Sequence, residues 1–331
     1  MLLGCYYLTM EVPGQFGEGK YFKDPEEAVV AYENDAVGLH AKIKVRMSKV
    51  IDGEIKYKTI ETTVGRILFN QGIPQNLGFV DRTNPEEMFN LEIEFTVDKK
   101  ALGPIIAKSI NANGLAETAE LLDYIKETGY KNSTLGGITI SVSDIKVPEN
   151  KKDILENADK EIDNIRKQYR RGLITEKERF DLVISVWDKA KKDIEKELES
   201  YAKSDEYEDN PIFIMMNSKA RGSISNFVQL AGMRGTMAKP NGEPVEIPIK
   251  SSFRDGLSVS EFFISTHGAR KGNTDTALKT ADAGYLTRRL VDVAQDIIVK
   301  DYDCGSIQGV VVQDLLNDKD GSVIEPLEER I

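Results

Sequence analysis

The sequence has no long apolar run and is poor in cysteine and histidine. No stretch approaches the roughly 18 apolar residues that a membrane-spanning helix needs, so none is expected. Two cysteines, Cys5 and Cys304, cannot build a disulfide framework, which favours a reducing cytoplasmic compartment. Cys5 lies in an apolar, strand-like stretch and is expected in the core. The two histidines, His40 and His267, lack triad spacing, so we expect neither to be catalytic.

The chain is acidic as a whole but basic in one stretch. Its 331 residues carry 44 Lys and Arg against 55 Asp and Glu, a formal net charge of -11. Between Lys219 and Arg289, however, eleven Lys and Arg stand against six Asp and Glu. The acidic total argues against a free-standing nucleic-acid-binding protein, whereas the distribution allows one basic segment to contact phosphates.

The first part of the chain, residues 1–150, mixes strand and helix patterns. Alternating apolar residues predict a strand over 38–47, and the β pattern continues over 56–69. A helical period over 116–129 stops at its last glycine, and the pattern over 136–148 returns to a strand. We therefore predict an α+β fold made of several distinct elements.

Residues 151–206 predict an antiparallel helical hairpin. Each helix has one apolar face and is otherwise densely charged. The apolar positions are Ile154, Ala158, Ile162, Ile165 and Tyr169 in the first helix, and Phe180, Val183, Ile184, Trp187, Ala190, Ile194, Leu198 and Tyr201 in the second. Gly172 separates the helices, and Thr175 with Glu178 forms a capping box. The charges fit either a solvated surface or a docking site for another protein.

Two irregular regions flank the segment 257–294, which is described below. Residues 207–256 are expected to be a loop-rich segment packed against something large, because 215–244 contain Gly222, Gly232, Gly235 and Gly242 among basic and apolar residues. Residues 295–331 form a C-terminal segment in which 317–322 is expected to be a hairpin turn.

A long helix is predicted over residues 257–294. Ser258 followed by Glu261 is a second capping box, which marks its start. At 1.5 Å per residue the helix is a rod of about 50 Å. Three interior glycines, Gly268, Gly272 and Gly284, each cost about 1 kcal/mol relative to alanine. They indicate either a close backbone approach or a helix that bends.

One face of this helix consists of very small side chains. Ala277, Thr280, Ala281 and Gly284 recur at helical spacing, Arg288 extends the stripe, and Lys279 flanks it. A flat face bordered by cations allows a nucleobase to lie on the helix while the charges hold phosphates. Close packing against another helix also needs small residues, so spacing alone leaves both interpretations open.

Several segments together resemble one family. "FISTHGARKG", "DTALKTAD" and "GYLTRRLVDVAQD" resemble the bridge helix of the bacterial RNA polymerase β′ subunit. "NSKARGS" and "QLAGMRGTMAKP" are similar to the loop before it, "LGCYYLT" and "GITISVSDI" to preceding β′ segments, and the charged hairpin to the rim helices of the secondary channel. The resemblance implies a cytoplasmic, nucleoid-associated bacterial protein with a pore-lining region over 1–150.

The resemblance also implies roles for single residues. The new template base pair would pack on Thr280 and Ala281, beside Gly284, with Lys279, Arg288 and Arg289 near the nucleic-acid path. Arg221 would face the triphosphate of the incoming NTP, and Gly268 and Gly272 would act as hinges. Gly172, Leu173, Ile174 and Thr175, at the hairpin tip, would receive Gre-type factors. Asn273 and Thr274 depart from the Leu-Ala usual in the family.

The family's Mg²⁺-binding aspartate motif, NADFDGD, is absent from these residues, and so is its trigger loop. Cys304 occupies the position of the first of four zinc-binding cysteines, whose partners would lie downstream. We therefore expect a central part of β′ that is inactive alone and binds neither Mg²⁺ nor Zn²⁺ by itself. Its partners would be the rest of β′, the other core subunits, template DNA, nascent RNA and NTPs. The alternative is a docking module for channel-entering factors.

Overall fold

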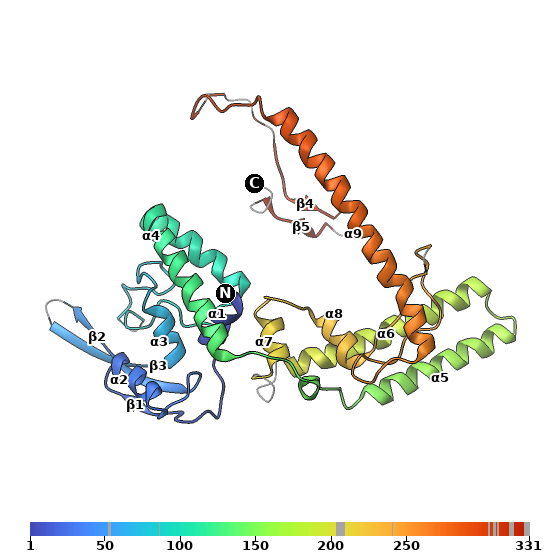
Figure 1. Ribbon diagram of the computed structural model, residues 1–331, viewed down its shortest axis with the longest axis horizontal. Helices are drawn as coiled ribbons and strands as arrows, with labels where there is room; N and C mark the ends of the chain where they lie inside the picture. The colour runs from blue at the N-terminus through green and yellow to red at the C-terminus, as the bar shows by residue number, and fades with distance from the viewer. Residues whose placement is uncertain are drawn as a thin grey trace. The chain divides into compact units, whose positions relative to one another are not determined.

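The computed structural model describes residues 1–51, 54–85, 87–202, 209–239, 241–303, 305–306, 309, 311–317 and 321–327. The chain forms two compact units, Met1–Ala269 and Arg270–Ile331, and each is described by itself. Figure 1 labels the elements along the chain. Both helices and strands are present, which confirms the predicted α+β class.

The N-terminal part of the first unit combines a small sheet with four helices. The elements are α1 (Leu2–Thr9), β1 (Tyr21–Phe22), α2 (Pro25–Glu33), β2 (Lys42–Ile51), β3 (Glu54–Thr63), α3 (Val64–Asn70) and α4 (Lys99–Gly136). The strand order is β1-β2-β3, with β1 parallel and β3 antiparallel to β2. Register places Val45 opposite Ile60, and both side chains enter the core beneath the sheet.

Helices α1 and α4 cross at very short range because both carry glycine at the crossing. A Cβ atom added to Gly4 would lie 1.8 Å from the carbonyl oxygen of Gly129. A Cβ on Gly129 would lie 2.5 Å from the oxygen of Met1 and 3.0 Å from the Cys5 sulfur. The crossing buries Cys5 completely, together with Ile125 of α4. Cys5 is thus a core residue as predicted, but it lies in a helix and not in a strand.

Two further sequence predictions have the right type of element but the wrong bounds. The β pattern over 56–69 ends at Thr63, because the Thr63 hydroxyl accepts a hydrogen bond from the Arg66 amide (3.2 Å) and caps α3. The helix predicted over 116–129 is part of α4, which passes Gly129 and has a kink at Gly114 (φ 79°).

The segment 136–148 forms no strand. It contains one short 3-10 turn, η1 (Val142–Asp144). Ile140 is 51% exposed and Val142 68% exposed, so the alternating side chains find no partner strand and no core to cover. Alternation alone does not make a strand when neither edge is paired.

The helical hairpin is confirmed. Helix α5 (Lys151–Arg170) and helix α6 (Glu176–Ala202) lie side by side and antiparallel (Figure 1). Most of the predicted apolar positions on both helices are buried against each other, including Ile162, Trp187 and Ile194. Tyr169 instead remains 40% exposed at the end of α5, where the guanidinium of Arg179 lies 5.3 Å from the centre of its ring.

The loop-rich segment packs on this hairpin. Its short elements are α7 (Pro211–Asn217), α8 (Ile224–Phe227) and the π-helical turn η3 (Val228–Gly232). Phe213, Phe227 and Met233 join the same buried cluster as Trp187 of α6. The sequence predicts that the loop-rich segment packs against something large, and the α5–α6 hairpin is that partner.

Helix α9 (Val259–Ala294) begins in the first unit and continues into the second. Beyond it, β4 (Leu315–Leu316) pairs antiparallel with β5 (Val323–Glu325), and the Asn317 amide donates to the Ser322 carbonyl oxygen at 2.8 Å. The predicted C-terminal hairpin is confirmed at these residues; its tip, 318–320, lies outside the described residues. Among the helices described, none is both long and apolar enough to cross a membrane.

Candidate nucleic-acid interface

The start of α9 is fixed by the predicted capping box. The Ser258 amide donates to the Glu261 carboxylate at 2.9 Å, and the Glu261 amide donates to the Ser258 hydroxyl at 3.3 Å. The same carboxylate accepts from the Ser251 hydroxyl at 3.1 Å, which ties the helix start to the preceding loop. These bonds hold the pKa of Glu261 below its usual value, although burial opposes them.

The small-residue stripe on α9 is fully open. Ala277, Thr280, Ala281 and Gly284 are all exposed. The Thr280 hydroxyl bonds back to the Thr276 carbonyl oxygen at 2.7 Å, so the methyl group of this side chain, and not its hydroxyl, contributes to the face. The stripe is consequently smooth and poor in free hydrogen-bond donors, which suits stacking more than polar recognition.

The three glycines of α9 have no steric reason within the described residues. A Cβ atom added at Gly268, Gly272 or Gly284 would meet no atom within 4 Å. Thus the close backbone approach considered for them is not made by the part of the chain that the structure describes. Their remaining physical consequence is lower helix stability, by about 1 kcal/mol each.

Three cations lie near the stripe. At about 100° per residue Arg288 continues the stripe itself, whereas Lys279 lies about 100° beyond Thr280 and Arg289 about 80° beyond Ala281, toward the back of the helix. The guanidinium of Arg289 lies 5.5 Å from the centre of the Tyr285 ring. Arg288 is exposed and has only a 3.8 Å contact with Asp292, which screening weakens. All three charges can reach an external anion.

Arg221 lies at an exposed turn between α7 and α8. Together with Gly222 (φ 83°) it lines a cavity of about 160 Å³ whose other walls come mainly from Ile212, Met216 and Phe227. The apolar walls fix the backbone of the turn, while the guanidinium remains in solvent. The described residues thus place an exposed cation beside an apolar cavity.

The hairpin tip shows a mixture of exposed and anchored residues. Gly172 has φ 71°, a left-handed conformation that glycine adopts without strain. Leu173 is 69% exposed, whereas Ile174 packs against the buried hairpin cluster. Thr175 and Glu178 form the predicted capping box, with hydrogen bonds of 2.8 and 3.3 Å. Of the four tip residues, only Leu173 therefore offers a large apolar contact to a partner.

Ion pairs that sequence reasoning missed join the loop before α9 to the hairpin. Their members are Arg179 with Glu246 near the tip, Asp159 with Lys250 in the middle, and Lys151 with Asp255 at the base. The Lys250 ammonium lies 2.7 and 2.8 Å from the two Asp159 oxygens and 5.0 Å from the centre of the Trp187 ring. No local signal could predict pairs between residues so distant in the sequence.

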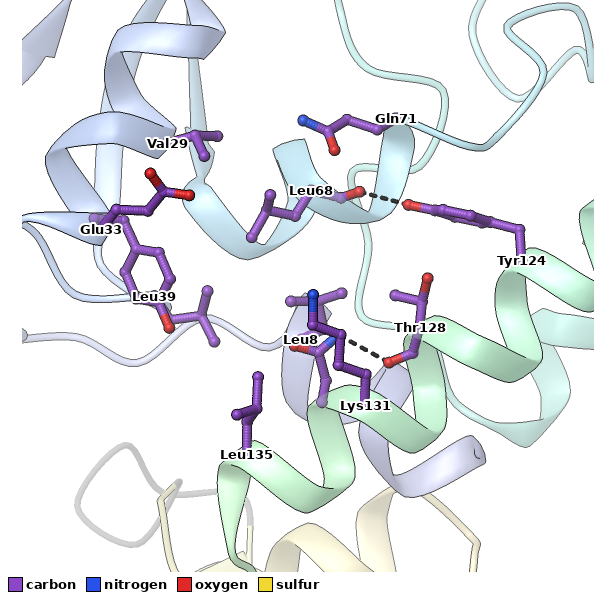
Figure 2. Close-up of a pocket in the computed structure, with 12 residues that line it drawn as sticks. Leu8, Val29, Glu33, Leu39, Leu68, Gln71, Tyr124, Thr128, Lys131 and Leu135 are labelled. Carbon is purple, nitrogen blue, oxygen red and sulfur yellow. Dashed lines mark hydrogen bonds between the residues drawn. The ribbon is translucent and has the colours of Figure 1, made fainter.

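A separate cavity of about 300 Å³ lies among α1, α2, α3 and α4 (Figure 2). Leucines such as Leu8, Leu39 and Leu68 form its apolar wall, and the Tyr124 hydroxyl donates to the Leu68 carbonyl oxygen at 2.7 Å. Glu33 and Lys131 line it with opposite charges. None of the residues predicted as functional lines this cavity.

Metal-binding groups do not gather in the part of the chain that is described: it has no cluster of three or more His, Cys, Asp and Glu side chains. Cys304, the predicted zinc ligand, lies outside the described residues. Burial raises the pKa of the Cys5 thiol to about 11, so Cys5 is held as a neutral core residue. His40 is also buried, and the His267 ring centre lies 5.4 Å from that of Phe263.

Models of three consecutive domains of one family match the chain. They are RNA polymerase Rpb1 domain 3 over residues 1–145, domain 4 over 174–261 and domain 5 over 256–329. Together these ranges include the α1–α4 region, the loop before α9 and α9 itself.

Curated relatives agree with the family models. A DNA-directed RNA polymerase subunit beta' of Clostridium botulinum is 55% identical over 332 residues. Those of Caldicellulosiruptor saccharolyticus and Caldanaerobacter subterraneus are 55% and 54% identical. Each alignment covers 100% of this chain and 28% of the relative. The chain thus spans just over a quarter of the length of these relatives, and it belongs to the bacterial RNA polymerase β′ subunit family.

Proposed function

We propose that this chain acts within a bacterial DNA-directed RNA polymerase, where the template base packs against α9 during RNA synthesis. The observation that carries this proposal is the exposed, smooth face of Ala277, Thr280, Ala281 and Gly284 on α9. A face without side-chain bulk accepts any base pair equally, which template-directed copying of all four bases requires.

The flanking cations would hold the nucleic-acid backbone. Arg288 continues the stripe, so it can contact a phosphate beside a base that rests there, and the long side chains of Lys279 and Arg289 would reach phosphates farther around the helix. Arg221 would contact the triphosphate of the incoming NTP, for which a guanidinium is well suited because it forms paired hydrogen bonds with phosphate oxygens.

Gly268 and Gly272 would act as hinges of α9. A Cβ atom finds free space at both positions, so packing among the described residues gives no reason for glycine there. A helix weakened at two points one turn apart bends at lower cost than a uniform one. In the polymerase, such bending would accompany the step from one template position to the next.

The hairpin tip would receive factors that enter the secondary channel, such as coiled-coil proteins of the Gre type. Leu173 provides an exposed apolar contact, and the surrounding helix ends are charged. Gly172, Ile174 and Thr175 would then shape and support that contact.

The metal ions of the enzyme would be held mainly outside these residues. Mg²⁺ supplies charge stabilisation for phosphoryl transfer when bound, and its aspartate motif is absent from this sequence. Cys304 would supply one thiolate to a zinc site, which needs three further ligands from elsewhere. The complete enzyme would work in the bacterial cytoplasm, on the nucleoid, together with the other core subunits.

Reconstitution tests this function. The chain is combined with the complementary parts of β′ and the other core subunits, and Mg²⁺-dependent extension of an RNA primer on a DNA template is measured. We expect extension with the complete set, none with the chain alone, and impaired extension when Thr280 and Ala281 are both replaced by glycine. Failure to restore extension, in an assay where an authentic β′ segment succeeds, would contradict the proposal.

The alternative function is a docking module that acts only through the hairpin tip. Leu173→Ala then impairs factor binding, whereas Lys279→Ala has no effect on any activity. The proposed function predicts that Lys279→Ala slows nucleotide addition without changing factor binding. Measuring both activities for both variants separates the two functions.

A further inference from the structure

The cavity among α1, α2, α3 and α4 is large enough to hold a small molecule (Figure 2). Its volume is about 300 Å³, and all its walls belong to the first compact unit. One water molecule takes up about 30 Å³ of the liquid, so the cavity has room for about ten non-hydrogen atoms. Binding pockets for small molecules begin at about 300 Å³ and combine apolar walls with a few polar groups. This cavity meets both conditions.

The wall that α4 provides is fixed by contacts within the protein. The Tyr124 ring lies in this wall, and its hydroxyl donates to the Leu68 carbonyl oxygen at 2.7 Å. A Cβ atom added to Gly72 would lie 2.5 Å from the same ring, so the chain that follows α3 packs directly on it. Leu8 of α1 also lines the cavity and is fully buried in the core cluster that α1 and α4 share. These side chains are therefore held in place without a ligand.

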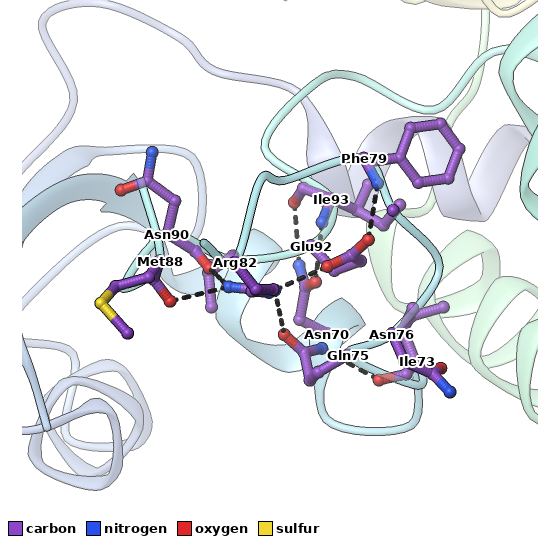
Figure 3. A network of polar contacts seen from close by, with 12 residues as sticks. Asn70, Ile73, Gln75, Asn76, Phe79, Arg82, Met88, Asn90, Glu92 and Ile93 are labelled. Atoms are coloured by element: carbon purple, nitrogen blue, oxygen red, sulfur yellow. Dashed lines mark hydrogen bonds and ion pairs between the residues drawn. The ribbon is translucent and has the colours of Figure 1, made fainter. Parts of the chain in front are cut away.

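The wall that α3 provides is fixed in a similar way. Leu68 and Gln71 lie at the C-terminal end of this helix, next to Asn70. The Asn70 amide group donates to the Ile93 carbonyl oxygen at 2.8 Å and accepts from the Ile93 backbone amide at 2.9 Å (Figure 3). Asn70 is buried, so these bonds are shielded from water. A cavity whose walls are already held binds a ligand at a lower entropic cost than one that must first be ordered.

Two opposite charges line the cavity from different helices. Glu33 reaches it from α2 and Lys131 from α4 (Figure 2). In the part of the chain that the structure describes, neither charged group forms an ion pair or a hydrogen bond, and the two do not pair with each other. Glu127 precedes Lys131 by one turn of α4 but makes no ion pair with it. The cavity thus offers one anionic and one cationic group, both without a protein partner.

We propose that this cavity binds a free amino acid with an apolar side chain of about the size of leucine. The ligand's side chain fills the apolar part of the cavity, which includes Leu8 and Leu39. Its ammonium group pairs with Glu33 and its carboxylate pairs with Lys131. Partial enclosure strengthens both pairs relative to an open surface, because fewer waters screen them.

The two charges favour a free amino acid over a segment of polypeptide. Inside a polypeptide the main-chain amino and carboxyl groups are amides, so a leucine side chain inserted from another protein would leave both charges of the cavity without a partner. An apolar ligand with a single charge would leave one of them. Only a zwitterion matches both Glu33 and Lys131.

Equilibrium dialysis of the whole 331-residue chain against radiolabelled L-leucine tests the proposal, and it does not depend on the role proposed for α9. Two analogues serve as competitors: 4-methylpentanoate lacks the ammonium group of leucine, and 3-methylbutylamine lacks its carboxylate. We expect saturable binding of leucine. Each analogue should compete more weakly than unlabelled leucine by about tenfold, because it leaves one charge of the cavity unpaired.

Variants of the chain locate the site. Glu33→Gln and Lys131→Met each remove one charge at an exposed position and should weaken leucine binding by about tenfold. Glu26→Gln on α2 and Lys126→Met on α4 are the matched controls, since both residues are exposed and neither lines the cavity. Circular dichroism checks that all four variants are folded.

The variants also test which charge meets which group of the ligand. In Lys131→Met, 3-methylbutylamine should compete as well as leucine, because the carboxylate no longer has a partner. In Glu33→Gln, 4-methylpentanoate should do so. No saturable binding of leucine, equal competition by either analogue in the parent chain, or an equal loss of binding in the control variants would each overturn the proposal.

Discussion

The guanidinium of Arg179 on α6 makes a two-point ion pair with the carboxylate of Glu246 in the loop before α9, with one Nη–Oε distance of 3.1 Å. Arg179 also lies against the ring of Tyr169 on α5. This one side chain therefore connects both hairpin helices to the loop that leads into α9. Its hydrogen bond lowers the pKa of Glu246, which keeps the carboxylate charged.

Removing this contact should loosen the loop. Arg179→Ala leaves Glu246 partly buried without its partner, at an expected cost of about 2 kcal/mol. Hydrogen exchange should therefore become faster at Val245 and Ile249, whose amides are bonded within the loop at 2.7 and 2.9 Å. Lys196→Ala on the same helix is the matched control, since Lys196 is exposed and pairs within α6 with Asp193 at 3.5 Å. Equal exchange in the two variants would show that the pair does not hold the loop.

The α1–α4 crossing should tolerate no side chain. Gly4→Ala places a methyl group 1.8 Å from the Gly129 oxygen, so the helices must separate, at a cost of about 3 kcal/mol or more. Gly268→Ala is the comparison, because its methyl group meets open space and should stabilise α9 by about 1 kcal/mol. Thermal unfolding followed by circular dichroism measures both. A Gly4→Ala variant as stable as the parent would contradict the close crossing.

Buried His40 should make the first unit sensitive to mild acid. Burial lowers its pKa from 6.5 to about 4, although the Met10 backbone opposes this, and its ring packs edge-on against that of Tyr7 with the ring centres 4.5 Å apart. The unfolded chain takes up a proton near pH 6.5 that the folded chain accepts only near pH 4, so stability is complete above pH 6.5 and decreases between these values. The expected loss is about 3 kcal/mol.

The variant His40→Leu isolates this effect from the carboxylates that also titrate. Denaturant midpoints are measured from pH 4.5 to 7.5 for both chains, and the parent should lose more stability toward low pH than the variant. Parallel pH dependences would mean that His40 is accessible to protons in the folded chain.

Local spacing predicted the features that depend on neighbouring residues. The capping boxes Thr175–Glu178 and Ser258–Glu261 form as expected because their members are three positions apart, and the hairpin follows from two apolar faces of helical period. Spacing failed over 136–148, where alternation is present but no strand lies beside it. It also could not predict Arg179–Glu246, which joins residues 67 positions apart.

Spacing also predicted only part of the candidate site. It predicted a face of small side chains from Ala277 to Gly284, whereas the exposure of that face is known from the structure. Its assignment to the template base came from the resemblance, since small residues serve helix packing equally well. Nor could spacing predict that Lys49 of β2 lies opposite Lys56 of β3, since the two become neighbours only through the strand register.

Rigid variants of α9 should separate helix stability from function. Gly268→Ala and Gly272→Ala should each stabilise the helix by about 1 kcal/mol. In the reconstituted polymerase they should nevertheless slow extension, because a stiffer helix bends at higher cost. Single-nucleotide addition rates measure this. Unchanged or faster extension in both variants would remove the hinge role while leaving the template role intact.

A photoreactive template base tests the central claim most directly. The reconstituted polymerase is assembled on a template that carries 4-thiothymine at the position to be copied, irradiated, and the crosslinked peptide is identified by mass spectrometry. The account predicts a crosslink to α9 between Ala277 and Gly284, lost when the base is moved several positions along the template. A crosslink confined to other parts of the polymerase would contradict it.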